Sequence, residues 1–405
     1  MVPELRKDFN ERYTTEHYRT LISRLTDAAR TRVEFRVAET PCFFTESMLD
    51  AIARAGSELT HQLLDNPDYL ERSAAAVPEQ FRVPQDTPHP HFMTADFGLV
   101  REEDGTLAPR LVELQAFPSI YGMQSVISRE YVDAFELDPG LAWFLGGHDD
   151  DSYWNLLERV IVGDHDPENV ILLEVEPAAQ KTLPDFNITE DRLGIRAVDI
   201  TTLVKQGNRL FYPHQGALVP IHRIYNRAIV DEIVRKNIQL PFDYRDDLDV
   251  EWAGHPNWYF RISKFSIPYL DHPTVPPAVF LDEWFAGKGR DRLPSDREQW
   301  IFKPLYSFAG KGIQFAPTDE DLASVPADER HNYLLQQRVQ FASVIDTPHG
   351  LTQPEVRILY AWPDGDELQP LLSLLRLGRG LMMGVDHNRD REWVGASAGL
   401  FFPGT

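Results

Sequence analysis

The pattern of hydrophobic and polar positions predicts a helical start to the chain, over residues 1–90. Apolar side chains recur there at helical spacing after Thr45, a candidate N-cap. They are Leu49, Ile52, Ala53, Leu59 and Leu63. Residues 80–92 (QFRVPQDTPHPHF) carry three prolines and predict a connection that ends this helical region.

Strand patterns begin after this connection. Residues 93–116 predict a β-hairpin, because two strand-like runs flank an Asp104-Gly105 turn. Residues 123–136 and 152–161 read as helices, and NVILLEVE at 169–176 is a short apolar run typical of a buried strand. Alternating strands (RLFY, LVPIHRIY) and a helix (AIVDEIVRK) follow up to about residue 240.

Strands dominate again from residue 300 onward, in WIFK, GIQF, YLLQQRV, EVRILYAW and LQPLLSLLRL. This mixture of strands and helices predicts an α/β or α+β protein rather than an all-β one. With 405 residues, the chain is long enough for two or three packed units.

Composition narrows the range of partners. The net charge of −23 argues against a general nucleic-acid binder, which needs a basic face. No apolar run approaches the roughly 20 residues of a membrane helix, and the charged start MVPELRKDFNERY does not read as a signal peptide. Cys42 is the single cysteine, which suits a reducing compartment. We therefore expect a cytoplasmic protein without nucleic-acid or membrane partners.

The stretch WIFKPLYSFAGKGIQF, residues 300–315, places glycines and lysines between two strand-like runs. It is not a Walker A loop, because Lys311 precedes Gly312 instead of Ser or Thr, and a strand follows instead of a helix. The pattern predicts either a flap that covers phosphates with its backbone N–H groups, with Lys303 at its base, or a plain surface hairpin.

Glu113 and Gln115, in LVELQAF, lie two apart on a predicted strand and therefore share one face. Val112, Leu114 and Ala116 are expected on the other face. One carboxylate and one amide oxygen suit Mg²⁺, which takes few ligands from protein. The alternative is a strand with an ordinary polar outer face.

Three other motifs have simpler interpretations. GASAG at 395–399 fits the nucleophile-elbow pattern, but too little chain follows to supply the partner residues, so it reads as a small-residue loop. His89 and His91 lack partnered cysteines for zinc. The acidic run 149–151 predicts a helix start. A further set of charged residues reads as an ion network that could also face a site: Arg223, Arg227 and Asp231.

The order of these motifs resembles the circularly permuted ATP-grasp superfamily, which includes eukaryotic glutathione synthetase and glutathionylspermidine synthetase. An early hairpin with Glu-x-Gln precedes an α/β segment, a lysine, a glycine loop, the strand LLQQRV, an arginine and a small-residue segment. The resemblance spans roughly residues 92–400. It implies a helical region at 1–90, an ATP-grasp core at 91–165 and 246–405, and an inserted Rossmann-like substrate domain at 166–245.

The resemblance also implies roles for individual residues. Glu113, Gln115 and Asp96 fall on metal-binding positions, with Gln115 where the family has asparagine. Lys303 and Arg376 fall on residues that act on the transferred phosphoryl group. The nucleotide-binding positions are Lys264, Lys303, Gly310, Lys311, Gly312, Gln336 and Gln337.

The implied activity is an ATP- and Mg²⁺-dependent ligase that joins a small-molecule acid to an amine through an acyl phosphate. One departure is that residues 303–307 (KPLYS), ending at Ser307, lack the carboxylate that the family carries after the lid lysine. Two alternatives therefore stay open: a catalytically degenerate nucleotide-binding protein, and a kinase of a small-molecule hydroxyl. The sequence does not define the oligomeric state, and a homodimer is possible.

Overall fold

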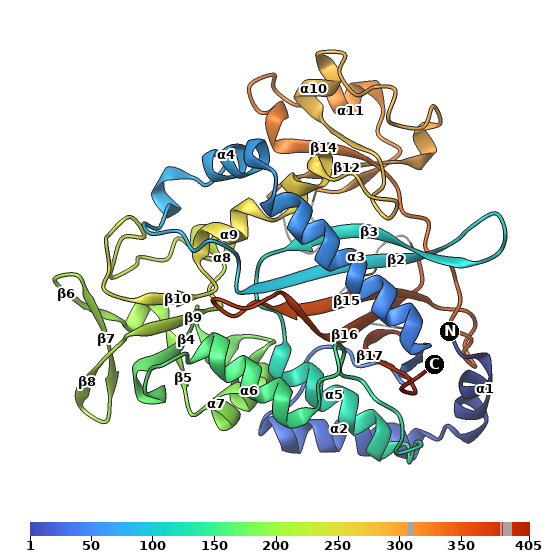
Figure 1. Ribbon diagram of the computed structural model, residues 1–405, viewed down its shortest axis with the longest axis horizontal. Coiled ribbons are helices and arrows are strands. Elements are labelled where there is room, and N and C mark those ends of the chain that lie inside the picture. Colours follow the sequence, from blue (N-terminus) through green and yellow to red (C-terminus); the bar gives the residue numbers. More distant parts are fainter. Residues whose placement is uncertain (307–311, 381–382, 384–390) are drawn as a thin grey trace.

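The computed structural model describes residues 1–306, 312–380, 383 and 391–405, which form a mixed α/β protein with four β-sheets (Figure 1). The glycine and lysine at 310 and 311 lie outside these residues. In the described part of the chain, no helix is long and apolar enough to cross a membrane.

A six-stranded sheet forms the centre, and its strands come from both ends of the chain. In spatial order the strands are β1 (Cys42–Phe43), β17 (Gly395–Leu400), β16 (Gln369–Gly378), β15 (Gln353–Ala361), β2 (Phe92–Arg101) and β3 (Leu107–Gln115). Strands β1 and β17 are parallel, and every other neighbouring pair is antiparallel. The first 90 residues are thus not helical throughout, because they also supply an edge strand.

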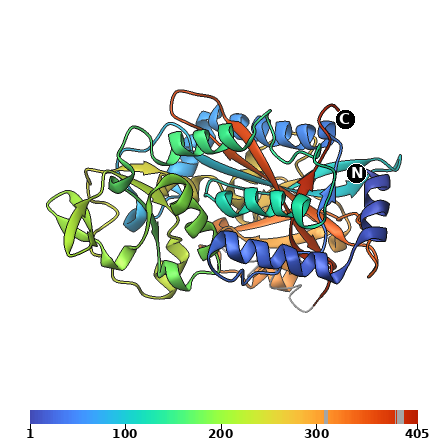
Figure 2. The same ribbon diagram turned by 90° about the horizontal axis from the view of Figure 1, so that it is seen from below.

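Helices cover the two faces of this sheet. The bounds are α1 (Pro3–Arg12), α2 (Thr15–Ala29), α3 (Glu46–Leu64), α4 (Pro67–Ala75), α5 (Tyr121–Ala134) and α6 (Asp150–Ile161). Helix α3 crosses one face (Figure 1), and the Thr45 side chain caps it by accepting a hydrogen bond from the Met48 N–H, as expected. Helices α2 and α5 lie side by side at the bottom of Figure 1, in front of the sheet in Figure 2, and share a hydrophobic core with it.

The predicted hairpin is confirmed as β2 and β3, with Gly105 in the left-handed region at φ 86°. The predicted face of Val112 is wrong. A β-bulge pairs Asp96 with Glu113 and Phe97 with Leu111, which leaves Val112 as the extra residue. Leu111 therefore joins Leu114 in the core, while Val112 stays partly exposed.

The middle of the chain forms a parallel sheet of strands β10 (Glu251–Ala253), β9 (Arg223–Asn226), β4 (Val170–Glu174) and β5 (Arg196–Asp199). Helices α7 (Leu183–Leu193) and α8 (Val230–Arg235) accompany it. A separate antiparallel sheet contains β6 (Val204–Gln206), β7 (Arg209–His214) and β8 (Ala217–Pro220). The run LVPIHRIY is therefore two strands of different sheets; Pro220, which lacks an N–H, ends the first.

A fourth sheet, at the top of Figure 1, is antiparallel. Its strands are β11 (Ala278–Phe280), β14 (Tyr333–Gln337), β12 (Trp300–Pro304) and β13 (Gln314–Phe315). Two short helices, α10 (Leu281–Phe285) and α11 (Asp319–Ala323), pack on it, and the 3₁₀ turn η5 (Lys264–Tyr269) contacts β11. Helix α9 (Pro256–Arg261) packs against α4.

The segment GASAG is a strand, part of β17, and not the expected loop. Its small residues do permit close approach: a Cβ on Gly399 would collide with the Ser373 hydroxyl, and one on Gly395 with the Arg36 carbonyl. Ser397 is fully buried and donates to the Thr40 carbonyl at 2.6 Å. The expected helix start at 149–151 is confirmed, with Asp149 as the N-cap of α6.

Candidate functional site

Strand alternation places charged residues of the central sheet on the face opposite α3. Val356 and Ile358 of β15 belong to the core that α3 completes, so Glu355 and Arg357 point to the other side. The same rule applies to Asp96 on β2, which lies between the core residues Ala95 and Phe97.

Asp96 is the centre of this charged group. Arg357 donates to both of its carboxylate oxygens, at 2.6 and 2.7 Å, and Arg376 also pairs with it. Burial alone would raise the pKa of Asp96, but the two guanidinium groups outweigh burial and hold the pKa below its usual value. The residue therefore stays ionised and fixes both arginines.

Arg376 also pairs with Glu355, which lies opposite it across β15 and β16. Glu355 is 5% exposed, and burial raises its pKa although Arg376 opposes the shift. Burial lowers the pKa of Arg376, but Glu355, Asp96 and Glu113 reverse the shift and raise it. A firmly cationic arginine thus lies among three carboxylates.

Lysines approach the same carboxylates from outside the central sheet. Lys264, at the start of η5, places its Nζ 3.2 Å from Oε1 of Glu113 on β3. Lys303 on β12 donates to Oε1 of Gln336, on the neighbouring strand β14, at 2.8 Å. Both lysines are buried.

The pKa of Lys303 is strongly shifted by its surroundings. Burial lowers it from 10.5 to about 8, and the nearby charge of Lys264 acts in the same direction. The carboxylates of Glu113 and Glu355 oppose the shift. Lys303 therefore lies within electrostatic range of Lys264, Glu113 and Glu355.

The structure therefore brings together most of the described residues that the sequence singled out. Gln115 belongs to the group too, since Arg357 approaches its Oε1 at 3.4 Å. Gln337 contributes a backbone N–H bonded to the Pro277 carbonyl. Gly312 has φ 76°, and a Cβ there would lie 2.8 Å from Cγ of Pro304. Gly310 and Lys311 lie outside the described residues.

Two members of the cluster were missed by sequence reasoning: Glu355 and Arg357. The signal was present, because they alternate with apolar residues in EVRILYAW as charged residues do on one face of a half-buried strand. Only the pairing of β15 with β2 and β16 shows that this face meets Asp96 and Arg376.

A cavity of about 190 Å³ opens beside the cluster. Glu113, Gln115 and Lys264 line its polar side, and Asp231 of α8 brings a further carboxylate from the parallel-sheet region. The remaining wall is mostly aromatic and apolar: Phe81, Phe117, Tyr259, Phe260, Leu305 and Tyr306.

The sequence also indicated an ion network that includes Arg223 and Arg227. In the structure, Arg227 pairs with the buried Asp185 at 2.7 Å, and Arg223 pairs with Glu251.

The oxygen donors meet part of what Mg²⁺ requires. Mg²⁺ usually takes one or two protein carboxylates and completes its octahedron with phosphates and water, and Glu113 with Gln115 could supply that part. Both oxygens of Asp96, by contrast, are engaged by arginines. Within the described residues, no three His, Cys, Asp or Glu side chains converge on one metal position.

The chain has a glutathione synthetase-like fold. The solved structure that shows this is a glutathione synthetase-like effector of Globodera pallida in its apo form, which matches with a TM-score of 0.58 and 12% sequence identity. The match covers 96% of this chain and 99% of the effector, so the likeness concerns the whole architecture. At this identity the comparison establishes the fold alone.

Comparison of the sequence with known proteins gives weaker likenesses than comparison of the fold. No family model matches the chain. Isoleucine–tRNA ligases from three strains of Streptococcus agalactiae are 22% identical over 239 residues, which is 51% of this chain. The chain spans only 24% of the length of these relatives.

Proposed function

We propose that the protein is an ATP-dependent carboxylate–amine ligase that forms an amide bond through an acyl-phosphate intermediate. The observation that carries the proposal is the cluster of Lys264, Lys303 and Arg376 with Glu113, in a protein of glutathione synthetase-like fold. Phosphoryl transfer depends chiefly on such positioning and charge neutralisation, and it needs no protein nucleophile.

The basic residues have distinct roles in this proposal. Lys264 and Lys303 neutralise the triphosphate, and the hydrogen bond between Lys303 and Gln336 places the lysine beside β14, whose backbone around Gln337 holds the adenine. Arg376, positioned by Asp96 and Glu355, stabilises charge on the transferred phosphoryl group.

Glu113 and Gln115 would hold Mg²⁺, which when bound supplies positive charge to the ATP phosphates. Glu113 is already paired with Lys264, so the site is electrostatically balanced before any ligand arrives. We assign Asp96 to positioning the two arginines. It would serve as a metal ligand only after releasing Arg357.

The cavity beside Lys264 is the proposed place for the acid and the amine. Its aromatic walls exclude water from the acyl phosphate, which would otherwise hydrolyse. Asp231 offers a carboxylate that can bind an ammonium group.

The decisive experiment measures ADP release and product mass from purified protein given Mg·ATP with pairs of acids and amines. Amino acids, small peptides and polyamines are the panel. ADP release that needs both an acid and an amine supports the ligase, whereas release with a hydroxyl compound alone supports a kinase.

A second candidate is a nucleotide-binding protein without ligase turnover. Two observations favour it: arginines occupy both Asp96 and Glu355, and residues 303–307 carry no carboxylate. Nucleotide binding that is tight, together with the absence of ADP release across the whole panel, would select this candidate.

A further inference from the structure

One side of the cavity beside Lys264 is a continuous row of aromatic rings, here called the aromatic wall. Its members, in order, are Phe117, Tyr259, Phe260 and Tyr306. Their successive ring centroids are 5.7, 5.1 and 6.2 Å apart, and each neighbouring pair meets edge to face. Phe81 stacks on Phe260 at 6.3 Å. Because aromatic rings favour such contacts, a further ring that enters the cavity can continue the row.

Part of the cavity's lining is exposed to solvent although it is apolar. Val234 of α8 is 59% exposed, and Tyr306, which follows β12, is 36% exposed. Across the described residues four large apolar side chains are exposed, and two of them line this cavity. Apolar side chains that are exposed together mark a binding site for a ligand or a partner. The deeper part is fixed, because Phe260 is buried and packs with Val77 and Val230.

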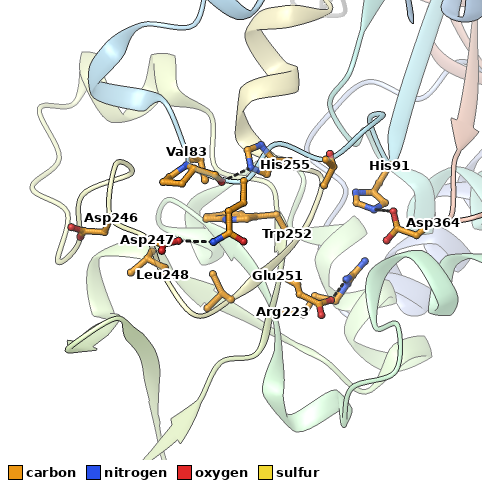
Figure 3. A pocket seen from close by; sticks show the side chains of 14 residues that line it. Val83, His91, Arg223, Asp246, Asp247, Leu248, Glu251, Trp252, His255 and Asp364 are labelled. Atoms are coloured by element: carbon orange, nitrogen blue, oxygen red, sulfur yellow. Dashed lines mark hydrogen bonds and ion pairs between the residues drawn. The ribbon is translucent and has the colours of Figure 1, made fainter.

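A second cavity has the same volume, about 190 Å³, but a different lining (Figure 3). Four carboxylates line it, those of Asp246, Asp247, Glu251 and Asp364, and Trp252 is the single Phe, Tyr or Trp among its described lining residues. The cavity beside Lys264 has five Phe and Tyr side chains and two carboxylates in its described lining. An anion that carries an aromatic ring would therefore favour the cavity beside Lys264.

The aromatic wall offers no charged partner to a ligand. Lys264 is the one Lys or Arg in the described lining, and it already pairs with Glu113 at 3.2 Å. Burial raises the pKa of the Tyr259 hydroxyl, and the negative charges of Asp231 and Glu113 raise it further, so both carboxylates lie within electrostatic range of this hydroxyl. A side chain that lies along the wall should therefore be uncharged and apolar.

We propose that the acid substrate is an arylalkanoic acid, such as 3-phenylpropanoate, whose ring lies against the aromatic wall and whose carboxylate faces Lys264. An apolar protein cavity of about 150 Å³ can hold benzene, so the volume of about 190 Å³ suffices for a phenyl ring. Asp231 stays available to the amine. The inference rests on the proposed ligase function, which supplies the role of the carboxylate; the aromatic wall supplies the selectivity for the ring.

The test is calorimetric titration of the full chain with 3-phenylpropanoate, propanoate and L-glutamate. The titrations are made without nucleotide and with Mg²⁺ and a non-hydrolysable ATP analogue. We expect saturable one-site binding of 3-phenylpropanoate. Propanoate and L-glutamate should bind at least about tenfold more weakly, because they lack the ring that the wall would bury.

Variants at the exposed rim test where the ring lies. Tyr306→Ala removes one ring and should weaken 3-phenylpropanoate binding about fivefold. Val234→Asp places a carboxylate at the rim and should weaken it about threefold. Leu218→Asp, an equally drastic change at an exposed position of β8, is the control. Asp247→Asn, in the cavity of Figure 3, should also bind as the wild type does.

Turnover separates this inference from the proposed ligase. With Mg·ATP and the amine panel, KM should be lower for 3-phenylpropanoate than for propanoate. Ring-dependent binding without ADP release for any acid would keep the ring site and overturn the ligase. ADP release with polar acids alone would keep the ligase and overturn the inference. Equal or absent binding of 3-phenylpropanoate and propanoate, wild-type affinity in both rim variants, or altered affinity in Asp247→Asn would each overturn it too.

Discussion

Lys303 combines a positive charge with nearly complete burial, at 6% exposure. A cation in that position costs free energy unless a partner compensates it, and Gln336 is a neutral partner. The anionic phosphates of ATP would supply the compensating negative charge. This is the physical basis for expecting Lys303 to matter more for ligand binding than for folding.

Lys303→Met, which keeps most of the length of the side chain and removes its charge, should weaken Mg·ATP binding by ~1.5–3 kcal/mol, the value of a hydrogen bond to a charged group. Titration calorimetry on folded protein measures this. Lys288→Met, at an exposed position, is the control and should bind normally. Unchanged affinity in Lys303→Met would remove Lys303 from the site.

The lowered pKa of Lys303 predicts two opposite effects of pH. Between about 8 and 10.5 the unfolded chain holds a proton that the native lysine has lost, so the free energy of unfolding should rise with pH across this window. Mg·ATP affinity should instead fall as pH rises through about 8, because the neutral lysine attracts phosphate less. Urea unfolding and calorimetry at several pH values test both effects, which Lys303→Met should diminish.

Glu113→Gln is nearly isosteric and should fold, but it removes the carboxylate that pairs with Lys264. We expect loss of Mg²⁺-dependent turnover, seen most clearly at limiting Mg²⁺, if the carboxylate holds the metal. Glu103→Gln, at an exposed position beyond β2 in the same hairpin, is the control. Wild-type activity in Glu113→Gln would leave Glu113 with only a structural ion pair.

At the scale of elements, β12 and β13 bring Lys303 and Gly312 together at the two ends of the glycine segment. Gly312→Ala combines φ 76° with a Cβ 2.8 Å from Pro304. It should destabilise this hairpin by more than the ~1 kcal/mol of an Ala forced into positive φ alone, and it should weaken Mg·ATP binding.

Gly287→Ala is the matched control for that change. Gly287 has φ 83°, but a Cβ added there would meet no described neighbour within 4 Å. The variant should lower the free energy of unfolding slightly and leave nucleotide affinity intact. If both variants bind Mg·ATP equally well, Gly312 serves a turn and not the nucleotide.

At the scale of the whole molecule, the first helices are part of the main core. Leu25 of α2 is fully buried in the cluster that includes α5 and the central sheet. Leu25→Ala should therefore lower the free energy of unfolding of the entire protein by about 2–5 kcal/mol. Ser23→Ala, exposed on the same helix, should have little effect. If Leu25→Ala and the wild type have equal denaturation midpoints, α2 is only loosely attached.

Much of the local structure could be predicted from the sequence. The Thr45 cap, the Gly105 turn, the buried strand β4 and the Asp149 helix start depend on neighbouring residues, so short-range patterns suffice. The errors arose where pairing between strands decides the local structure. The bulge at Val112 is set by pairing with β2, and the strand at GASAG by pairing with β16.

The candidate site, too, could be predicted only in part from the sequence. Strand alternation by itself determined that Glu113 and Gln115 share a polar face. The resemblance in motif order predicted that Lys264, Lys303 and Arg376 belong to one site. Only the tertiary structure decided that Asp96 is bound by two arginines and that Glu355 joins them. The physical reason is that alternation fixes a face within one strand, whereas the partners on that face come from strands hundreds of residues apart, and burial then sets which charges persist.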